Sequence, residues 1–324
     1  FYGWWIVVAC TLIMGTFFTL LLSCLSLFTV PICEDLGISR SAFSTFSTIL
    51  SVMGMILSPI AGKLCATKNT RMIMTGTLII GVIGYIGISF VQNVGLLYAL
   101  AVIIGFGSSF CTTVPIAVIL TRWFVKARGT AMSITFAGSS IGAMILSPII
   151  SKIIADTSWR AAIRYLGIGM LVVLVPLVFL IIRTKPEDKG LKALGADEAP
   201  AAGTGSAPAN DVGLPLKDLQ KKPIFWIYVL AIFIMLLTMG AMYHMAAHVS
   251  MIVDATAAAK FVSIFSLIAI GGKLLMGAVF DKSLTGGILL GTVSMALCFV
   301  FLLIAKNFTM LLPVALFYGL GSAH

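Results

Sequence analysis

Lys273 is a charged residue well inside a long apolar segment, in the sequence Ile270-Gly-Gly-Lys-Leu274. An ionisable side chain at such a position indicates a functional site by default. Because side chains of a helix lean toward its amino terminus, this lysine is directed away from Asp281 at the end of the segment. Its helical face carries small or polar residues: Ser263, Ser266, Ala269 and Gly277. We expect Lys273 to attract an anion in a cavity; a structural role at the membrane boundary is the alternative.

Hydroxyl side chains recur at helical spacing in other apolar segments. One face of the first segment carries Thr16, Thr19, Ser23 and Ser26, and later segments contribute Ser108, Ser109, Thr112, Thr113, Ser133 and Ser140. We expect Thr16, Thr19, Ser23, Thr112, Ser140 and Ser266 to bind substrate. Close helix packing is the alternative for each of them, and it is the expectation for Gly138 and Gly142. His244 and His248 are candidates for an outer gate, or for interfacial hydrogen bonding.

The composition places these residues in a membrane. Of 324 residues, 60% are hydrophobic and 10% charged, compared with about 25% charged in soluble domains. So few charges exclude soluble enzymes, and the +10 net charge is spread over short gaps rather than gathered in a nucleic-acid-binding arm. The six cysteines show no metal-ligand spacing. We expect no metal and no cofactor.

Apolar segments of the roughly 20 residues that a membrane-spanning helix needs alternate with short polar connections. They lie at 4–30, 42–62, 72–91, 96–121, 129–150, 161–182, 224–247, 258–280 and 286–305, and a tenth begins near Thr309. Their continuous apolar runs exclude a β-barrel and predict an all-α polytopic membrane protein. The polar stretch 183–222 predicts a flexible linker between an amino-terminal six-helix bundle (1–182) and an incomplete carboxy-terminal bundle (223–324).

The Lys and Arg residues are distributed unevenly between the two sides. One set of connections holds fourteen, the other holds five, and two lie inside spans, which accounts for all 21. Positive residues mark the cytoplasmic side. We therefore expect a multi-pass protein of the plasma (inner) membrane, with its amino terminus and its central linker in the cytoplasm.

The two halves share a pattern after their second spans: Gly62-Lys-Leu-Cys-Ala-Thr-Lys68 followed by Arg71, and Gly277-Ala-Val-Phe-Asp-Lys-Ser283. Parallel repeats of this kind are a known transporter plan. They predict 6+6 helices, of which about nine and a half are present, and hence a carrier truncated at its carboxy terminus.

These loops resemble the major facilitator superfamily signature G-x-x-x-D-[RK]-x-G-[RK]-[RK]. The second copy fits at Gly277, Asp281 and Lys282, whereas the first has Ala66 in place of the acid. The segments 122–131, 158–160 and 185–190 are similar to the oxalate/formate antiporter and monocarboxylate transporter branch. The resemblance implies the major facilitator fold, a substrate carboxylate bound by Lys273, and Tyr318 in an aromatic pocket wall. It also implies gating loops that contain Gly62, Arg71, Arg128, Gly277, Asp281 and Lys282.

Together these features predict a secondary active transporter of small organic anions, either mono- or dicarboxylates, that works by alternating access. All eleven acids lie in loops, which favours exchange, or a proton carried by the substrate acid, over a protein carboxylate relay. The expected partners are a small carboxylate and the lipid bilayer, with no nucleic acid, and the expected state is a monomer. The alternatives are a carrier of neutral or cationic solutes such as sugars or drugs, and a non-transporting membrane sensor. No nucleophile–base pair or nucleotide loop indicates an enzyme.

Overall fold

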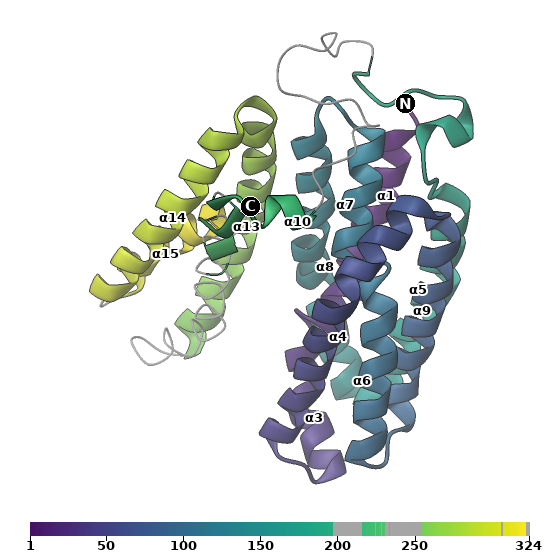
Figure 1. The fold of residues 1–324 in the computed structure, drawn as a ribbon. Helices are drawn as coiled ribbons and strands as arrows, with labels where there is room; N and C mark the ends of the chain where they lie inside the picture. The colour runs from purple at the N-terminus through teal and green to yellow at the C-terminus, as the bar shows by residue number, and fades with distance from the viewer. Residues whose placement is uncertain are drawn as a thin grey trace. The chain divides into compact units, whose positions relative to one another are not determined.

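The computed structural model describes residues 1–196, 216–223, 225–227, 229–230, 233, 255–305 and 307–321. The chain divides into two compact units, Phe1–Ala196 and Asp197–His324. The described residues are helical nearly throughout (Figure 1). The expectation of an all-α polytopic membrane protein is confirmed, because seven described helical stretches are long and apolar enough to cross a membrane.

The first unit contains six of these stretches, in the positions predicted from the sequence. The first joins α1 (Gly3–Ile13), a π-helical turn η1 (Met14–Phe18), α2 (Thr19–Leu21) and α3 (Leu25–Leu36). The second is α4 (Arg40–Thr67), and the third is α5 (Thr70–Gly87) with the 3-10 turn η2 (Ile88–Phe90). The fourth joins α6 (Val94–Ser109) to α7 (Thr113–Trp123), and the last two are α8 (Arg128–Asp156) and α9 (Trp159–Ile181).

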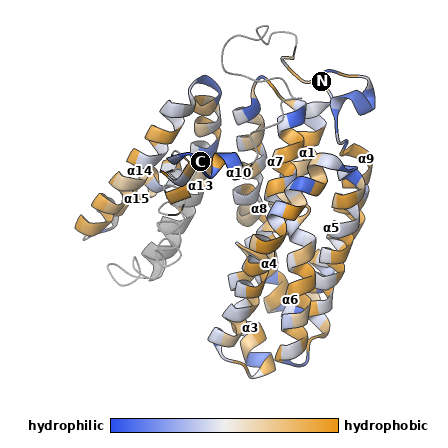
Figure 2. Cartoon of the chain, viewed as in Figure 1, coloured by the Kyte–Doolittle hydropathy of each residue, from blue (hydrophilic) through white to orange (hydrophobic). Residues whose placement is uncertain are grey.

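Helix boundaries in this unit follow local chemistry. The side chains of Ser39, Asn69, Asn93 and Ser158 each accept a backbone N–H at a helix start, as N-cap residues do. Hydrophobic residues run along the helices, and hydrophilic ones gather at the connections (Figure 2). Many large apolar side chains face outward, as a lipid-facing surface requires.

Small residues bring the first membrane helix close to α8. A Cβ atom at Gly142 would overlap the carbonyl group of Gly15, and one at Gly138 would overlap the carbonyl group of Thr11. The expected packing role of Gly138 and Gly142 is confirmed. Such close backbone approach is the usual use of the G-x-x-x-G pattern in membranes.

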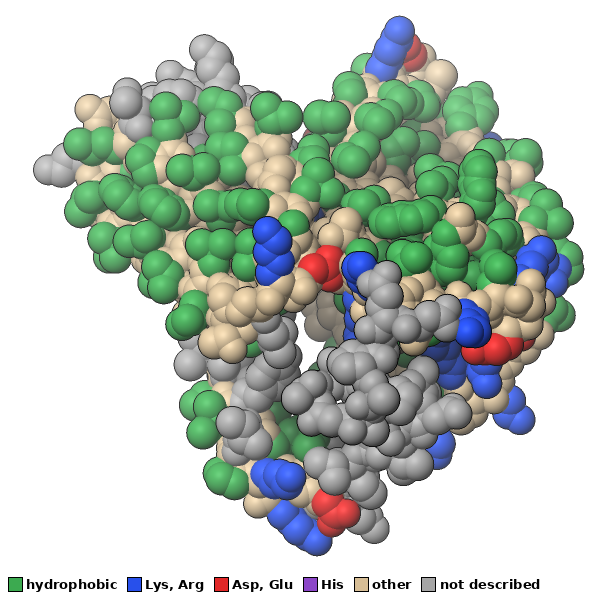
Figure 3. Space-filling view, turned by 90° about the horizontal axis from the view of Figure 1, so that it is seen from above, with side chains coloured by type: hydrophobic (Ala, Val, Ile, Leu, Met, Phe, Trp, Pro, Cys, Tyr) green, Lys and Arg blue, Asp and Glu red, His purple; other side chains and the backbone are tan. Residues whose placement is uncertain are grey.

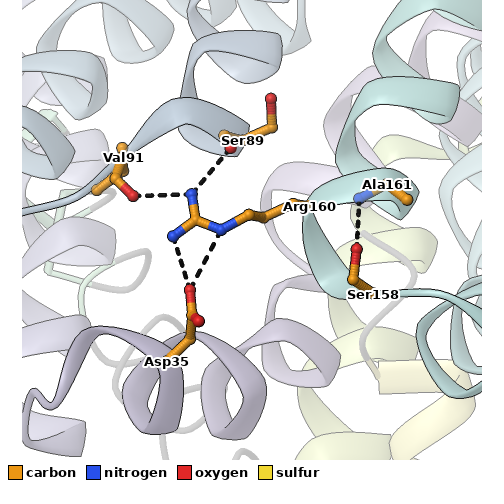
Figure 4. Close-up of polar contacts among 6 residues, drawn as sticks. All are labelled: Asp35, Ser89, Val91, Ser158, Arg160 and Ala161. Atoms are coloured by element: carbon orange, nitrogen blue, oxygen red, sulfur yellow. Dashed lines mark hydrogen bonds and ion pairs between the residues drawn. The ribbon is translucent and has the colours of Figure 1, made fainter.

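At the opposite end from Phe1, Arg160 joins three helix ends (Figure 4). Its Nη1 donates to the carbonyl oxygens of Ser89 (2.9 Å) and Val91 (2.8 Å). Its Nη2 and Nε donate to Asp35 Oδ2, at 2.6 and 3.2 Å. Since Asp35 belongs to α3, Ser89 to η2 and Arg160 to α9, this one guanidinium ties together the ends of three membrane helices.

The polar stretch after α9 differs from its predicted form. Trp123 Nε1 donates to the carbonyl oxygen of Arg183 (3.1 Å), and Leu194 pairs with Phe124 in a parallel β-bridge. Between them lies a 3-10 turn, η3 (Pro186–Lys189), which ends at Gly190 with φ 65°. The expected flexible linker is therefore wrong for residues 183–196, which fold onto the first unit. Backbone hydrogen bonds hold this segment in place, and these leave no apolar periodicity in the sequence from which the fold could be predicted. Residues 197–215 lie outside the described residues.

The second unit contains α10 (Leu216–Leu219), α13 (Ala255–Lys282), α14 (Leu284–Ile304) and α15 (Phe308–Gly321). The last three correspond to the predicted segments 258–280, 286–305 and the one beginning near Thr309. Buried Cys298, Leu311 and Val314 form the centre of their packing. Most of the predicted span 224–247 lies outside the described residues, and so do His244 and His248.

Candidate substrate-binding site

Two membrane helices of the first unit are interrupted partway along their length. The first changes to a π turn at Met14–Phe18 and is broken between Leu21 and Leu25. The fourth is broken between Ser109 and Thr113. π turns and discontinuous membrane helices both mark functional sites, because they free backbone polar groups inside the membrane.

A pocket of ≈ 210 Å³ lies beside both interruptions. Its apolar part comes from the first helix and α4, through Phe18, Leu21, Leu22 and Leu50. The remaining lining residues are mostly hydroxylic: Ser51, Gly54, Ser58, Ser108, Ser109, Thr112, Thr113 and Val114. This volume is smaller than the roughly 300–1,000 Å³ of drug-sized sites, so the pocket suits a small solute.

The pocket hydroxyls are held by their own helices. Thr112 Oγ1 donates to the carbonyl oxygen of Ser108 (2.7 Å), and Ser109 Oγ donates to that of Gly105 (2.6 Å). Ser58 Oγ makes the same kind of bond to Gly54 (2.6 Å). A hydroxyl with its hydrogen so engaged still has lone pairs to accept a bond, and it can rotate to donate one. Among the residues that the structure describes, the lining includes no charged side chain.

The structure separates the hydroxyls that the sequence grouped together. Thr112 lines the pocket. Thr19 is fully buried and donates to the carbonyl oxygens of Met14 (2.8 Å) and Ser139 (3.0 Å), so it fixes the π turn against α8. Thr16 donates to Leu12 (2.5 Å) and, like the half-buried Ser140 of α8, is not among the pocket-lining residues. Ser23 lies exposed in the interruption, next to Leu22.

Sequence reasoning missed the contribution of α4 to this pocket. Ser51, Gly54 and Ser58 follow one another at steps of three and four residues, which is the spacing of one helical face. The same criterion that selected the hydroxyls of the first segment would have found them.

In the second unit, Lys273 lies half-buried on α13. Its neighbour Gly272 meets the backbone of α15 so closely that a Cβ atom there would overlap the carbonyl group of Gly319. Tyr318, which precedes Gly319, is half-buried beside the apolar centre of this unit. Lys273 and Tyr318 therefore flank one helix crossing, whereas the side chain of Ser266 lies outside the described residues.

The candidate gating residues lie at helix ends. Arg71 stacks on Phe179 of α9, with Cζ 3.9 Å from the ring centroid. Gly62 lies on α4, and Arg128 begins α8 after Ala127, whose φ is 59°. In the second unit Gly277 is buried, while Asp281 and Lys282 are exposed at the end of α13.

Apolar helical stretches long enough to cross a membrane, two of them interrupted beside a small pocket, define this protein as a multi-pass membrane protein. The model of the Major Facilitator Superfamily matches residues 6–324. The chain belongs to the Major Facilitator Superfamily, and the expected fold is confirmed.

Relatives of known identity agree with this assignment. The mouse (Mus musculus) monocarboxylate transporter 12 is 30% identical over 169 residues, which are 51% of this chain and 34% of the relative. The oxalate:formate antiporter of Oxalobacter formigenes is 27% identical over 158 residues, or 48% of this chain and 37% of that protein. The chain thus spans about a third of the length of these relatives. The predicted resemblance to their branch is confirmed.

Solved structures agree on the fold. A bacterial homologue of the human lysosomal transporter Spinster, inward-facing and unoccupied, is 19% identical with a TM-score of 0.61, and the match covers 99% of this chain and 74% of that one. A proton:xylose symporter is 12% identical with a TM-score of 0.64, over 98% of this chain and 79% of its own. At these identities the likeness concerns the fold alone.

Proposed function

We propose that this protein is a secondary active transporter of small organic anions, mono- or dicarboxylates, that works by alternating access. The observation that carries the proposal is the half-buried Lys273 in the interior of α13. An ammonium group inside a membrane helix is costly unless an anion compensates it. A substrate carboxylate lowers that cost, so binding of the substrate and burial of the lysine favour each other.

The small hydroxyl-lined pocket of the first unit supports binding of a solute with oxygen atoms. Thr112 and its neighbours bond such a solute, while Phe18 and Leu21 pack against its carbon atoms. Names of relatives that include a monocarboxylate transporter and an oxalate:formate antiporter support the same substrate class. Exchange, or a proton carried in by the substrate acid, drives transport in this proposal.

The remaining parts of the proposal concern orientation and gating. The amino terminus and the segment after α9 face the cytoplasm of a plasma (inner) membrane, since the excess of Lys and Arg lies at that end. Each unit contributes gating residues on the inner side: Gly62, Arg71 and Arg128 in the first unit, and Gly277, Asp281 and Lys282 in the second. The working unit is a monomer. In its second unit Lys273 binds the substrate, with Tyr318 and Ser266 beside it and His244 and His248 at the outer gate, and in its first unit Thr112 binds substrate.

The experiment is uptake of labelled oxalate, formate and lactate by purified protein in proteoliposomes. Lys273→Ala should abolish uptake of every transported anion, whereas Lys273→Arg, which keeps the charge, should retain part of it with altered selectivity. An unchanged thermal unfolding midpoint of Lys273→Ala separates loss of binding from loss of folding. Undiminished anion uptake by the alanine variant would refute the assignment.

A carrier of neutral solutes is the second candidate, because the pocket in the first unit carries hydroxyls and no charge. It predicts uptake of a labelled sugar or polyol that Lys273→Ala leaves intact. Competition by unlabelled carboxylates distinguishes the two: it should block uptake only if the substrate is an anion.

A further inference from the structure

Among the described residues, Arg71 lies against the outward-facing surface of the first unit without a protein counter-charge. The guanidinium of Arg71, in the first turn of α5, covers the ring of Phe179 on α9. Its Nε is buried and has no hydrogen-bond partner. Within the part of the chain that the structure describes, Arg71 makes no ion pair. Among the described residues the two terminal Nη groups of Arg71 make no hydrogen bond either, so these groups can bond an outside ligand.

The surroundings of Arg71 are those of a membrane boundary. Phe179 is 41% exposed, and the adjacent Met72 and Leu180 are 59% and 62% exposed. Exposed apolar side chains continue at helical spacing along both helices, at Ile80 and Ile83 on α5 and at Ile168 and Val172 on α9. In a membrane protein such faces contact acyl chains. Arg71 therefore lies at the level where the head groups begin.

A second guanidinium lies at the same end of α9. Arg183 Nη1 donates to the carbonyl oxygens of Phe179 (3.3 Å) and Ile182 (2.9 Å). The backbone N–H of Thr70 donates to Thr184 Oγ1 (3.0 Å), which joins the residue before Arg71 to the residue after Arg183. The start of α5, which carries Arg71, therefore lies next to the chain that follows α9, which carries Arg183.

The electrostatic field at this end of the first unit favours anions. Figure 3 looks down on it and shows Lys and Arg side chains gathered beside a rim of hydrophobic ones. The described helix ends and connections on this side hold two acids, Glu187 and Asp188, and these basic residues: Lys63, Lys68, Arg71, Arg122, Lys126, Arg128, Arg183, Lys185, Lys189 and Lys192. Basic groups at a membrane surface attract anionic lipids by about 1 kcal/mol each.

We propose that Arg71 and Arg183 bind the phosphate of an anionic phospholipid whose acyl chain lies along the apolar faces of α5 and α9. The contact with the Phe179 ring, 3.9 Å from Cζ to the centroid, holds the guanidinium in place, and its two terminal nitrogens offer a planar pair of donors. A planar fork of this kind matches two phosphate oxygens, which an ammonium group does not. This inference depends on membrane embedding and not on the transported substrate.

Native mass spectrometry of the purified protein, released from membranes of equimolar phosphatidylglycerol and phosphatidylcholine, tests the proposal. The unmodified protein should retain one phosphatidylglycerol in preference to phosphatidylcholine. Arg71→Gln should lower that retention roughly fivefold, the equivalent of about 1 kcal/mol. Arg71→Lys should give an intermediate loss, because it keeps the charge but not the fork. Lys68→Gln, an exposed basic residue at the same end, is the matched control and should change retention less than twofold.

Three results would overturn the proposed site. The first is equal retention of phosphatidylglycerol and phosphatidylcholine, and the second is an equal loss of phosphatidylglycerol from Arg71→Gln and Lys68→Gln. The third is that protein in phosphatidylcholine alone binds inorganic phosphate and that this binding depends on Arg71 to the same degree. The second would indicate diffuse attraction and the third a site for a free anion. If Arg71→Gln is poorly folded, Phe179→Leu removes the ring but keeps the arginine, and it should still reduce retention of phosphatidylglycerol severalfold.

Discussion

Arg122, in the last turn of α7, donates hydrogen bonds to the carbonyl oxygen of Ala66 and to that of Cys65 (3.3 Å) at the end of α4. Ala66 occupies the position at which the family signature has an acid. The carbonyl groups at a helix carboxy terminus carry partial negative charge, and here they supply the partner that a carboxylate would otherwise provide. The contact between the ends of α4 and α7 is therefore kept without the acid.

A carboxylate restored at this position should strengthen the contact. Ala66→Asp places a negative charge beside Arg122, and we expect it to raise the free energy of unfolding by about 0.5–1 kcal/mol, the usual worth of a partly exposed ion pair. The unfolding midpoint of the detergent-solubilised protein measures this. Ala66→Asn is the control of equal size without charge. Equal midpoints for the two variants would show that the backbone carbonyls already satisfy the guanidinium.

The adjacent glycines of α13 should differ in their tolerance of a methyl group. Alanine favours a helix over glycine by about 1 kcal/mol, and a Cβ atom at Gly271 meets open space, so Gly271→Ala should be neutral or stabilising. At Gly272 the same atom overlaps the carbonyl of Gly319, so Gly272→Ala should destabilise by about 1–3 kcal/mol. Thermal unfolding of the two variants is compared side by side. A tolerated Gly272→Ala would mean that the crossing of α13 and α15 is looser than described.

Two threonines make the same hydrogen bond to their own helix, and comparing their variants distinguishes a role in binding from a role in structure. Thr112 and Thr135 each donate Oγ1 to the carbonyl four residues earlier, at 2.7 and 2.9 Å, but only Thr112 lines the pocket. Thr112→Val should raise KM for the transported solute roughly 5–10-fold, the worth of one hydrogen bond, and leave the unfolding midpoint nearly unchanged. Thr135→Val is the control and should leave KM unchanged. A similar KM in both variants would remove Thr112 from the site.

Loss of the Arg160 guanidinium should lower the thermal stability of the first unit. Arg160→Ala leaves the carbonyl groups of Ser89 and Val91 and the carboxylate of Asp35 without their donor. An unpaired acceptor costs about 1–3 kcal/mol, so the unfolding midpoint should fall. Asp35→Asn should cost less, since Asp35 is 45% exposed and the two carbonyl bonds remain. Lys152→Ala, on the exposed end of α8, is the control, and an equal fall in all three variants would contradict a specific role for Arg160.

Much of the fold could be predicted from local pattern. Apolar runs of about 20 residues define spanning helices because every backbone polar group must be bonded inside the lipid, and all six predicted spans of the first unit are present. Gly138 and Gly142 were predicted as packing residues from their spacing alone, since glycines four residues apart leave one helical face without side chains. The excess of Lys and Arg in one set of connections also needs no tertiary knowledge.

The candidate site needed the tertiary structure. Thr19 and Thr112 look alike in the sequence, yet Thr19 is buried against α8 and Thr112 faces the pocket. The difference arises because the π turn and the two helix breaks rotate the helical faces, and periodicity assumes unbroken helices. Residues 183–196 were unpredictable for a related reason: they are held by a backbone bridge from Leu194 to Phe124 and a hydrogen bond from Trp123 to Arg183, whose partners are far apart in the sequence.

The sequence by itself determined that this is a helical membrane protein with basic connections on one side and a lysine inside a span. These properties follow from hydropathy and charge, which act on each segment separately. Only the tertiary structure decided which hydroxyls share a pocket, which backbone groups bind Arg122, and that Arg71 rests on an outward-facing ring. Each of those depends on contacts between distant segments, for which no local pattern exists.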